Sequence, residues 1–296
     1  MHEQFLTATA RHADIVLPVN TFMERNDIAP PWLGSPYYIY LNKAVDSLHA
    51  SKTDLEICRE LAPRLGLSAD YFQQSDDQIL RTFARRRPDI PDFDAMQRDG
   101  VLKIHLPEPI VAFKAQIADP ANHPFGTLSG KIEIDCGHIA EMNNPRVPSI
   151  PKYLSHREHY DSPKARRYPL QLLTAHSKIR THSTLEQVPW LQELESQGAW
   201  IHPTDAAARG IKDGDPIEIF NERGRIRTTA RVTERILPGV VNVCQGAWYT
   251  PDDSGVDVGG CANTLTLDEP SPGGAFPMNS ALVEVVSAVE KAQEKP

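Results

Sequence analysis

The residues between 174 and 184 carry the side chains needed to bind an anionic ligand. They follow an apolar run in which Tyr168, Leu170 and Leu172 alternate with other positions, which predicts a strand that enters a core. Loops that extend from a rigid strand often carry binding residues. A second interpretation stays open, in which this is a solvated loop and Ser183 or Thr184 caps a helix beginning at Leu185. The polar side chains of the loop are Thr174, His176, Ser177, Lys178, Arg180, Thr181, His182, Ser183 and Thr184.

The composition is that of an ordinary globular protein with room for two domains. The chain has 296 residues, of which 40% are hydrophobic and 24% charged. Its net charge of −8 argues against a broad nucleic-acid-binding surface. We find no apolar run long enough to span a membrane, and the first residues lack the basic and apolar regions of a signal peptide. We therefore expect a globular protein without a transmembrane segment that does not bind nucleic acid.

The cysteines and histidines show no spacing that predicts a metal centre. No two cysteines have Cys-x-x-Cys spacing, so neither an iron–sulfur cluster nor a zinc knuckle is predicted. The two histidines of the segment HREH (156–159) have no further ligands nearby, so a solvated linker is the better interpretation. We expect the cysteines to be free thiols in small core positions. They are Cys58, Cys136, Cys244 and Cys261.

The first half of the chain has patterns typical of both strands and helices. A buried strand is predicted at 13–19, and an edge strand followed by a turn at 37–48. A helix is predicted at 53–67, with a Thr53 and Glu56 capping box and Gly66 at its end. Further helices are predicted at 75–87 and 93–102. The face of the first helix expected to be buried carries Leu55, Cys58, Leu61 and Leu65.

The second half begins with a proline-rich, irregular stretch and ends in short strands. At 123–135 a turn at Gly130 should lead into a strand that buries Ile132 and Ile134. A short helix with Thr204 as its cap and Gly210 as its end should follow. The short strands are typical of a small closed barrel. They are expected at 168–174, 216–220, 225–232, 240–243 and 281–286, before a frayed tail at 291–296.

Four stretches, in fixed order, resemble the molybdopterin-dinucleotide-binding domain at the C-terminal end of the dimethyl sulfoxide reductase family. They are YPLQLLTAHSKIRTHST (168–184), IHPTDAAARGIKDGDPIEIFNERGRI (201–226), LPGVVNVCQGAWY (237–249) and VGGCANTLTLDEPSP (258–272). The last is most similar to the family's dimethyl sulfoxide reductase catalytic chains. One departure is His202, at a position where the family usually has Asn. The resemblance implies a double-psi β-barrel.

The resemblance also implies that these loops bind molybdopterin guanine dinucleotide. That cofactor presents a pyrophosphate, which amides of Gly-rich loops can approach closely, and pterin and guanine edges that suit asparagine side chains. Arg180 and Lys178 could offset phosphate charge. Trp248 and Tyr249 could stack on a ring, although residue type alone favours a place in the core. The implied binding residues of this region are Thr174, His176, Ser177, Arg180, His182, Ser183, Asn221, Gly246, Trp248, Tyr249, Gly259, Gly260 and Asn263.

An upstream segment, TATARHADIVLPVNTFMERNDI (7–28), resembles a family segment in which a Thr-rich turn precedes a strand and an acidic loop. The resemblance places Thr7 and Thr9 near phosphate or pterin and matches Glu24 and Asp27 to the loop. In the alternative interpretation, the threonines only cap the turn. The implied fold class is mixed α+β, a partial α/β region followed by a double-psi β-barrel domain. The implied domains are the end of an α/β cofactor-binding domain (1–40), the second segment of a split α/β domain with a Pro-rich linker (41–165), and the dinucleotide-binding barrel (166–296).

The resemblance implies that this chain is the C-terminal part of an oxidoreductase and is not catalytic alone. The family's iron–sulfur domain and its ligand to molybdenum lie upstream of the matched stretches, so we predict no catalytic residue, metal ligand or iron–sulfur cluster here. The implied partners are the N-terminal part of the same enzyme and an iron–sulfur electron-transfer subunit. The family would be periplasmic or membrane-associated through partners, and otherwise the chain would be cytoplasmic. Two other functions stay open: a stand-alone module that holds or assembles the cofactor, and a barrel that binds proteins without a cofactor.

The cofactor interpretation makes a geometric prediction. Residues 174–184, 246–249 and 259–266 should converge on one concave, electropositive surface at one end of the barrel. Each stretch follows a strand-like run and carries Gly, Asn, Thr, His or Arg. Because the whole chain is acidic, a positive surface there would be a specific local arrangement.

Overall fold

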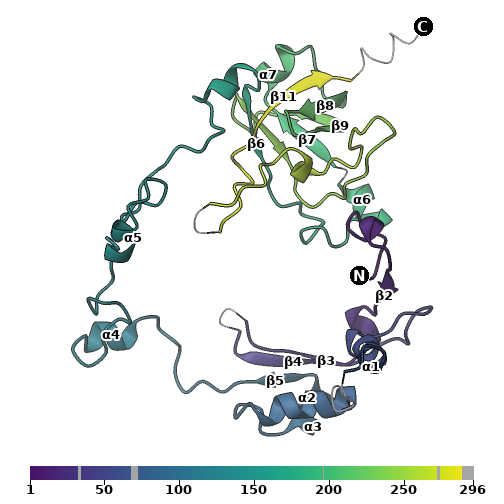
Figure 1. Ribbon diagram of the computed structural model, residues 1–296, viewed down its shortest axis with the longest axis vertical. Helices are drawn as coiled ribbons and strands as arrows, with labels where there is room; N and C mark the ends of the chain where they lie inside the picture. The colour runs from purple at the N-terminus through teal and green to yellow at the C-terminus, as the bar shows by residue number, and fades with distance from the viewer. Residues whose placement is uncertain (33–34, 68–72, 196, 272–273, 289–296) are drawn as a thin grey trace. The chain divides into compact units, whose positions relative to one another are not determined.

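The chain forms two compact units, Met1–His123 and Pro124–Pro296, seen in the computed structural model (Figure 1). The structure describes residues 1–32, 35–67, 73–195, 197–271 and 274–288, so the tail predicted at 291–296 lies outside the described residues. Each unit is treated separately below, and the three domain boundaries drawn from the sequence stay a prediction.

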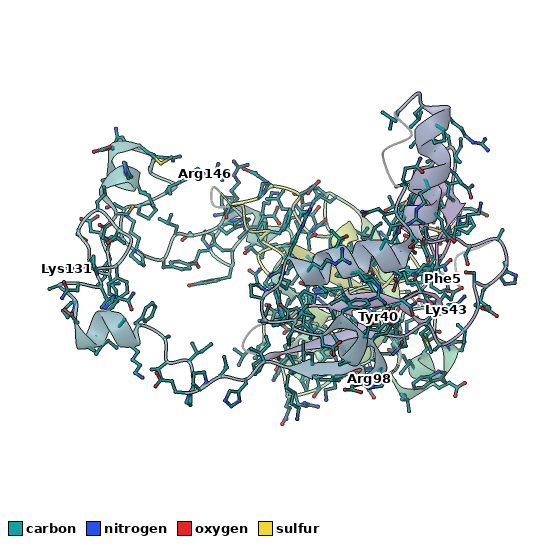
Figure 2. The ribbon with its side chains drawn as sticks, turned by 90° about the horizontal axis from the view of Figure 1, so that it is seen from below. Phe5, Tyr40, Lys43, Arg98, Lys131 and Arg146 are labelled. Carbon is teal, nitrogen blue, oxygen red and sulfur yellow. The ribbon has the colours of Figure 1, made fainter. Side chains whose placement is uncertain are left out.

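The first unit is built on a three-stranded antiparallel sheet with helices packed near it. In the strand order β3-β4-β5, Tyr38 and Tyr40 of β4 are buried, and they form a core with Ala84, Ile90 and Met96. Tyr40, labelled in Figure 2, meets the ring of Phe93 edge to face at 5.7 Å between centroids. The elements are β1 (His2–Glu3), β2 (Leu17–Pro18), β3 (Asp27–Ala29), β4 (Tyr37–Leu41), α1 (Asp54–Arg64), α2 (Asp76–Arg85), α3 (Phe93–Asp99), β5 (Val101–Lys103) and α4 (Lys114–Ala118), with short 3-10 turns at Ala10–His12 and Phe22–Glu24.

Capping residues set the ends of the three longer helices, and the capping box of the first was predicted from the sequence. Thr53 and Glu56 form the capping box of α1, and Ser75 begins α2 in the same way. Gly66, beyond α1, and Gly100, at the end of α3, have φ values of +69° and +74°, a conformation that glycine adopts without strain.

Three details of this unit differ from the sequence prediction. At 13–19 only Leu17–Pro18 is a strand, and Ile15 is 68% exposed, because β2 pairs only with the two-residue β1. The strand β4 is central and not at an edge, since it pairs with both β3 and β5. On α1 the unit buries Ile57 and Ala62, so the leucine stripe beside them is the wrong face.

The second unit begins with an irregular segment that contains α5 (Gly137–Glu141) and a 3-10 turn at Pro163–Arg166. Gly130 makes the predicted turn, with a φ of +67°, and its carbonyl accepts a hydrogen bond from the backbone N of Phe125. The strand expected after it does not form. Ile132 and Ile134 are 68% and 73% exposed, because no described strand pairs with this stretch.

The rest of the unit is a closed six-stranded barrel with the strand order β10-β6-β11-β8-β9-β7. The pairs β10·β6 and β7·β9 are parallel and the other four are antiparallel. Alternate residues such as Leu172, Ile217 and Ile219 point inward and are fully buried. A mixed barrel that follows an α/β region in the sequence confirms the predicted fold class, and it is consistent with a double-psi β-barrel. The strands are β6 (Leu170–Leu173), β7 (Gly198–Ile201), β8 (Pro216–Phe220), β9 (Arg225–Val232), β10 (Val240–Val243) and β11 (Leu282–Ser287).

The strand registers bring six strand termini to one end of the barrel, which we call the loop end. Leu173 of β6 lies beside Asn242 of β10, and Val243 lies beside Ala199 of β7. The final residue of β8, Phe220, lies beside the first residue of β9. The chain therefore leaves β6, β8 and β10, and enters β7, β9 and β11, at the loop end.

The helices of this unit also depart from the prediction in their details. The helix α7 (Pro203–Ala207), at the opposite end of the barrel from α6 (Figure 1), is capped by His202, whose Nδ1 accepts from the backbone N of Thr204 at 3.2 Å. The prediction that Thr204 caps this helix is wrong, because the imidazole of His202, two residues earlier, fills that role. No helix begins at Leu185, whose φ is +75°; α6 spans Pro189–Leu194 instead.

Candidate functional site

Three loops meet at the loop end of the barrel, and we call them the loop cluster: residues 174–184, 244–249 and 257–261. The backbones of these loops are in van der Waals contact at two glycines. A Cβ atom on Gly246 would lie 1.8 Å from the carbonyl oxygen of His182, and one on Gly259 would lie 2.0 Å from that of Trp248. The indole Nε1 of Trp248 donates to the carbonyl of Ser183 at 2.9 Å. The structure therefore brings together the first two predicted stretches and the start of the third, whereas Thr264 and Leu265 contact the β8–β9 turn. The concavity and positive charge of this surface stay predictions.

Gln197, which the sequence analysis missed, joins all three loops. It directly precedes β7, and its Oε1 accepts from Nη2 of Arg180 at 2.7 Å. Its Nε2 lies 3.0 Å from the carbonyl oxygens of both Cys244 and Gly260. No local pattern could identify this residue, because its partners come from distant parts of the chain.

Arg180 is engaged within the protein. Its side chain is only 3% exposed, and Nη1 forms an ion pair of 2.6 Å with Glu186. Nη2 also donates to the carbonyl of Gln245 at 3.2 Å, while Nε is buried without a partner among the described residues. Glu186 thus compensates the charge expected to face phosphate, while the N–H of Nε is not used by the described residues. A direct contact of Arg180 with a ligand stays a prediction.

Asp257 holds the third loop in shape and was also missed. It is fully buried, and its carboxylate accepts from the backbone N atoms of Thr250, Gly259 and Cys261 at 2.7, 3.0 and 2.6 Å. An aspartate two residues before a glycine pair is a turn signal that could have identified it. Because Gly259 donates to Asp257, its amide is occupied within the loop, whereas Gly260 supplies a carbonyl to Gln197.

The exposed rim of the cluster carries imidazole, hydroxyl and ammonium groups. The rings of His176 and His182 lie 5.1 Å apart, and Nε2 of Gln245 lies 3.0 Å from Nδ1 of His176. His182 has a φ of +53°, which is uncommon for a residue other than glycine. Ser183 and Lys178 are exposed beside them, and Ser177 is half-buried. These groups can donate hydrogen bonds to phosphate oxygens or to the edge of a heterocycle.

The other predicted residues of the barrel differ in their exposure. Thr174 is buried, and its backbone N donates to Oδ1 of Asn279 at 2.7 Å. Asn221 is also buried, where Nδ2 donates to the carbonyls of Leu265 and Leu282, so it ties the turn between β8 and β9 to Leu265 and to β11. Asn263 is exposed on the 3-10 turn Ala262–Thr264.

The two aromatic residues do not fill the core, which corrects the expectation drawn from residue type. Trp248 is half-buried, and Tyr249 is 39% exposed. Both belong to a loop that extends past β10, outside the closed set of inward-facing strand residues. Their rings are therefore part of the surface of the cluster.

Thr7, Thr9, Glu24 and Asp27 lie in the first unit. The hydroxyl of Thr7 accepts from the backbone N of Ala10 at 3.3 Å, as a turn cap would, whereas Thr9 makes no side-chain cap bond. Glu24 is 4% exposed, and hydrogen bonds from the backbone N of Leu48 and then of Thr21 lower its pKa to about 2. Asp27 begins β3 and lies 3.5 Å from Arg25. Within this unit Glu24 therefore fixes a loop conformation.

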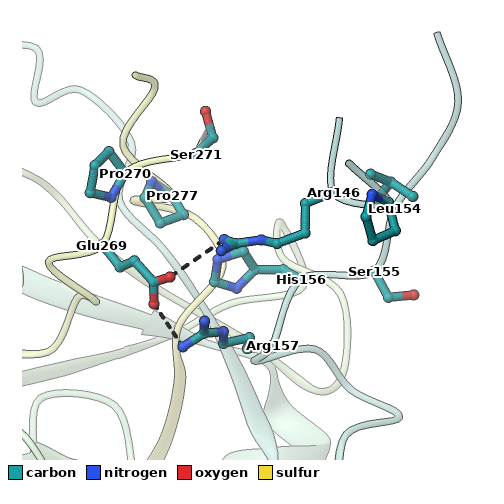
Figure 3. A pocket seen from close by; sticks show the side chains of 10 residues that line it. Arg146, Leu154, Ser155, His156, Arg157, Glu269, Pro270, Ser271 and Pro277 are labelled. Carbon is teal, nitrogen blue, oxygen red and sulfur yellow. Dashed lines mark hydrogen bonds and ion pairs between the residues drawn. The ribbon is translucent and has the colours of Figure 1, made fainter. Parts of the chain in front are cut away.

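A pocket elsewhere in the second unit contains none of the predicted residues. Arg146 and Arg157 approach the two carboxylate oxygens of Glu269 at 3.4 and 2.8 Å, with His156 beside them (Figure 3). Both arginines are more than half exposed. In the part of the chain that the structure describes, no three His, Cys, Asp or Glu residues could hold a metal ion, and no helix has the length and apolar character of a membrane span.

The donor set of the loop cluster suits a dinucleotide better than a metal ion. Exposed imidazole, hydroxyl and ammonium groups surround a framework fixed by Gln197 and Asp257, and a buried arginine keeps one N–H without a partner. Donors of this kind recognise phosphate and the mixed edges of a pterin or a purine. The residues present therefore fit the cofactor implied by the resemblance.

Comparison with known protein families assigns both units. The molydopterin dinucleotide binding domain matches residues 170–281, which include the whole loop cluster, and molybdopterin oxidoreductase matches residues 2–64. In structure, the acetylene hydratase from Pelobacter acetylenicus aligns with a TM-score of 0.75 at 22% identity, covering 97% of this chain and 40% of that chain. At this identity the similarity establishes the fold alone.

Relatives with closer sequences are reductases. The dimethyl sulfoxide reductase DmsA of Escherichia coli is 37% identical over 296 residues, which cover 95% of this chain and 36% of that protein. A dimethyl sulfoxide/trimethylamine N-oxide reductase of Cereibacter sphaeroides is 33% identical, with 88% of this chain and 34% of that protein covered. The chain thus spans little more than a third of these relatives. It belongs to the molybdopterin oxidoreductases of the dimethyl sulfoxide reductase family, and its barrel is their molybdopterin-dinucleotide-binding domain.

Proposed function

We propose that the loop cluster binds the guanine dinucleotide form of molybdopterin, as the C-terminal portion of a dimethyl sulfoxide reductase-like oxidoreductase. The observation that supports this proposal is the contact of three loops from distant parts of the chain. Two glycines in them permit backbone approaches that no larger residue allows, at Gly246 and Gly259. Such an arrangement gives the loops a fixed shape without using the polar side chains on the exposed rim.

The residues of the cluster divide into two roles in this proposal. His176, Ser177, His182, Ser183 and Asn263 would donate to or accept from the pyrophosphate and the heterocycle edges, and the rings of Trp248 and Tyr249 would contact a flat face. Thr174, Arg180, Asn221, Gly246, Gly259 and Gly260 would shape the loops that carry them. The cofactor supplies redox chemistry through its metal when bound, and this chain contributes binding and orientation.

The same proposal extends to the assembly around the chain. Because the described residues include no group of metal ligands, molybdenum would be held through the pterin, and any protein ligand to it would come from the N-terminal part of the enzyme. The first unit, which matches the molybdopterin oxidoreductases, would also bind the cofactor. The residues proposed for this are Thr7, Thr9, Glu24 and Asp27. An iron–sulfur subunit would deliver electrons.

The test uses GDP as a probe, because it carries the guanine and pyrophosphate of the dinucleotide. We expect the purified chain to bind GDP in equilibrium dialysis, and Arg180→Ala to weaken binding by roughly 1.5–3 kcal/mol through the loss of the charged hydrogen bonds that shape its loop. The control is Phe83→Leu, on α2 of the first unit, which should leave GDP binding unchanged. Absence of measurable GDP binding by the unmodified chain, or equal binding by the Arg180 variant, would contradict the proposal.

A further inference from the structure

The side chain of Gln197 makes contacts that no other residue type could reproduce. A planar amide has one acceptor oxygen and two N–H donors. The oxygen receives Nη2 of Arg180 at 2.7 Å, and the nitrogen lies 3.0 Å from the carbonyls of Cys244 and Gly260. Each partner belongs to a different loop of the cluster. A carboxylate would lack both donors, and a hydroxyl would be too short.

The backbone of Gln197 is anchored to the barrel. Its carbonyl accepts from the hydroxyl of Thr228 at 3.3 Å, and the next residue, Gly198, pairs with Thr229 of β9. A Cβ on Gly198 would lie 2.9 Å from Nε of Arg231, so the chain passes close to a side chain of β9 here. The amide therefore extends from a rigid strand to all three loops, whereas the other barrel contacts of Ala175 and Asp257 each hold one loop.

The third loop shows the same close fit around this side chain. Gly260 has a φ of +75°, and a Cβ there would lie 3.0 Å from Cγ of Gln197. The loop can thus place its carbonyl on the amide only with glycine at this position. Its other support, Asp257, accepts bonds from within the loop and from Thr250, one residue past the second loop, whereas Gln197 also reaches Arg180 of the first loop.

We propose that Gln197 is the positioning residue of the dinucleotide site, which sets the relative placement of the three loops and does not itself touch the ligand. This inference rests on the proposed function, since positioning has a purpose only if the cluster binds. Gln197 fixes the guanidinium of Arg180, and with it the part of the first loop that carries His182 and Ser183. It also fixes the second loop just before Gly246 and Trp248.

The decisive variant is Gln197→Glu, which preserves size and the contact with Arg180 but replaces the two N–H donors with a carboxylate oxygen that faces the carbonyl oxygens of Cys244 and Gly260. The matched control is Gln171→Glu, since Nε2 of Gln171 also donates to two backbone carbonyls, of Asn279 and Ala281, at 3.1 and 3.0 Å. The two changes remove the same number of amide donors, but of the two residues only Gln197 joins the three loops. We therefore expect similar losses of thermal stability.

The readouts are GDP affinity and the fluorine NMR signal of Trp248 in fluorotryptophan-labelled protein, assigned with Trp248→Phe. Gln197→Glu should weaken GDP binding at least tenfold and shift the Trp248 signal, whereas Gln171→Glu should change neither. If Gln197→Glu does not fold, Gln197→Met removes the same two donors, and also the acceptor for Arg180, without adding charge. Unchanged GDP affinity and an unchanged Trp248 signal in the Gln197 variants would overturn the proposal. Failure of the unmodified chain to bind GDP would instead overturn the proposed function, while the Trp248 signal would still test positioning.

Discussion

Two regions of the second unit use buried charge in opposite ways. One is the loop cluster, and the other is a set of three residues that we call the latch: Glu158, Lys164 and Arg223. In the latch, both oxygens of Glu158 receive Arg223, at 2.7 and 2.8 Å, and Lys164 and the backbone N of Leu282 complete the set at 2.7 and 3.2 Å. In the cluster, Arg180 has an ion pair with Glu186 but keeps a buried Nε without a partner among the described residues.

The difference separates a contact that holds the fold from one that prepares a surface. Glu158 is 2% exposed, and it connects the irregular segment before the barrel to the β8–β9 turn and to β11. Burial by itself would raise its pKa, but the hydrogen bonds from Arg223, Lys164 and Leu282 outweigh that effect and lower the pKa to about 2. Both oxygens of Glu158 accept hydrogen bonds from within the protein, whereas the rim of the cluster leaves imidazoles and hydroxyls exposed to solvent.

The latch should therefore give the largest loss of stability in this unit. Glu158→Ala leaves the largely buried Arg223 with the more distant carboxylate of Glu222, at 3.4 Å, in place of two short bonds. Breaking one side of a buried pair costs about 3–5 kcal/mol. We expect a loss of that size in the free energy of unfolding from urea denaturation followed by circular dichroism. GDP affinity, measured below the unfolding transition, should change by less than a factor of three.

The control for this variant is Glu269→Ala, which removes a carboxylate that pairs with two arginines at the surface. Surface pairs contribute about 0–1 kcal/mol, so its effect should be small. A small effect of Glu158→Ala, or a large loss of GDP binding in that variant, would show that the two regions do not divide stability and binding as described.

The latch also predicts a pH dependence with a defined sign. The pKa of Glu158 falls from 4.5 to about 2 on folding, so its contribution is complete above about pH 4.5 and is lost as the pH falls toward 2. A shift of this size corresponds to about 3 kcal/mol. The stability of the unmodified chain should fall more steeply over this window than that of Glu158→Gln. Parallel curves for the two proteins would contradict the ionised state of the latch.

Local patterns in the sequence were sufficient for much of the fold. The capping box of Thr53 and Glu56 and the alternation through β8 and β9 each depend on neighbours a few residues away. The convergence of the first two loops also followed from the sequence, because each comes directly after a strand, β6 or β10. The third loop follows no strand that the structure describes after β10. Single-segment patterns failed where burial depends on other elements, as at Ile15 and on the leucine stripe of α1.

The polar residues that hold the second unit together could not be found in this way. Glu158 lies 65 residues from Arg223 and 124 from Leu282, and its segment, HREH, was interpreted as a solvated linker. That interpretation is wrong for Glu158, since an isolated charge in a polar stretch gives no sign of its distant partner. Gln197 lies 47 residues from Cys244 and 63 from Gly260, and it was missed for the same reason.

The smallest expected loss of stability comes from a substitution in the loop cluster, Gly246→Ala, which should also weaken GDP binding. At Gly246 the φ is +95°, and a Cβ would lie 1.8 Å from the carbonyl oxygen of His182, so Gly246→Ala must displace one loop from the other. Gly239→Ala is the matched control, because its φ of +79° imposes a similar backbone strain while nothing lies within 4 Å. The strain should cost each variant about 1–2 kcal/mol, and overpacking should add about 1 kcal/mol at Gly246.

Only Gly246→Ala should weaken GDP binding, by tenfold or more, because it separates His182 from Trp248. Equal GDP affinities in the two variants would mean that the contact between these loops has no part in binding, and the cluster would then resemble the latch as a purely structural contact.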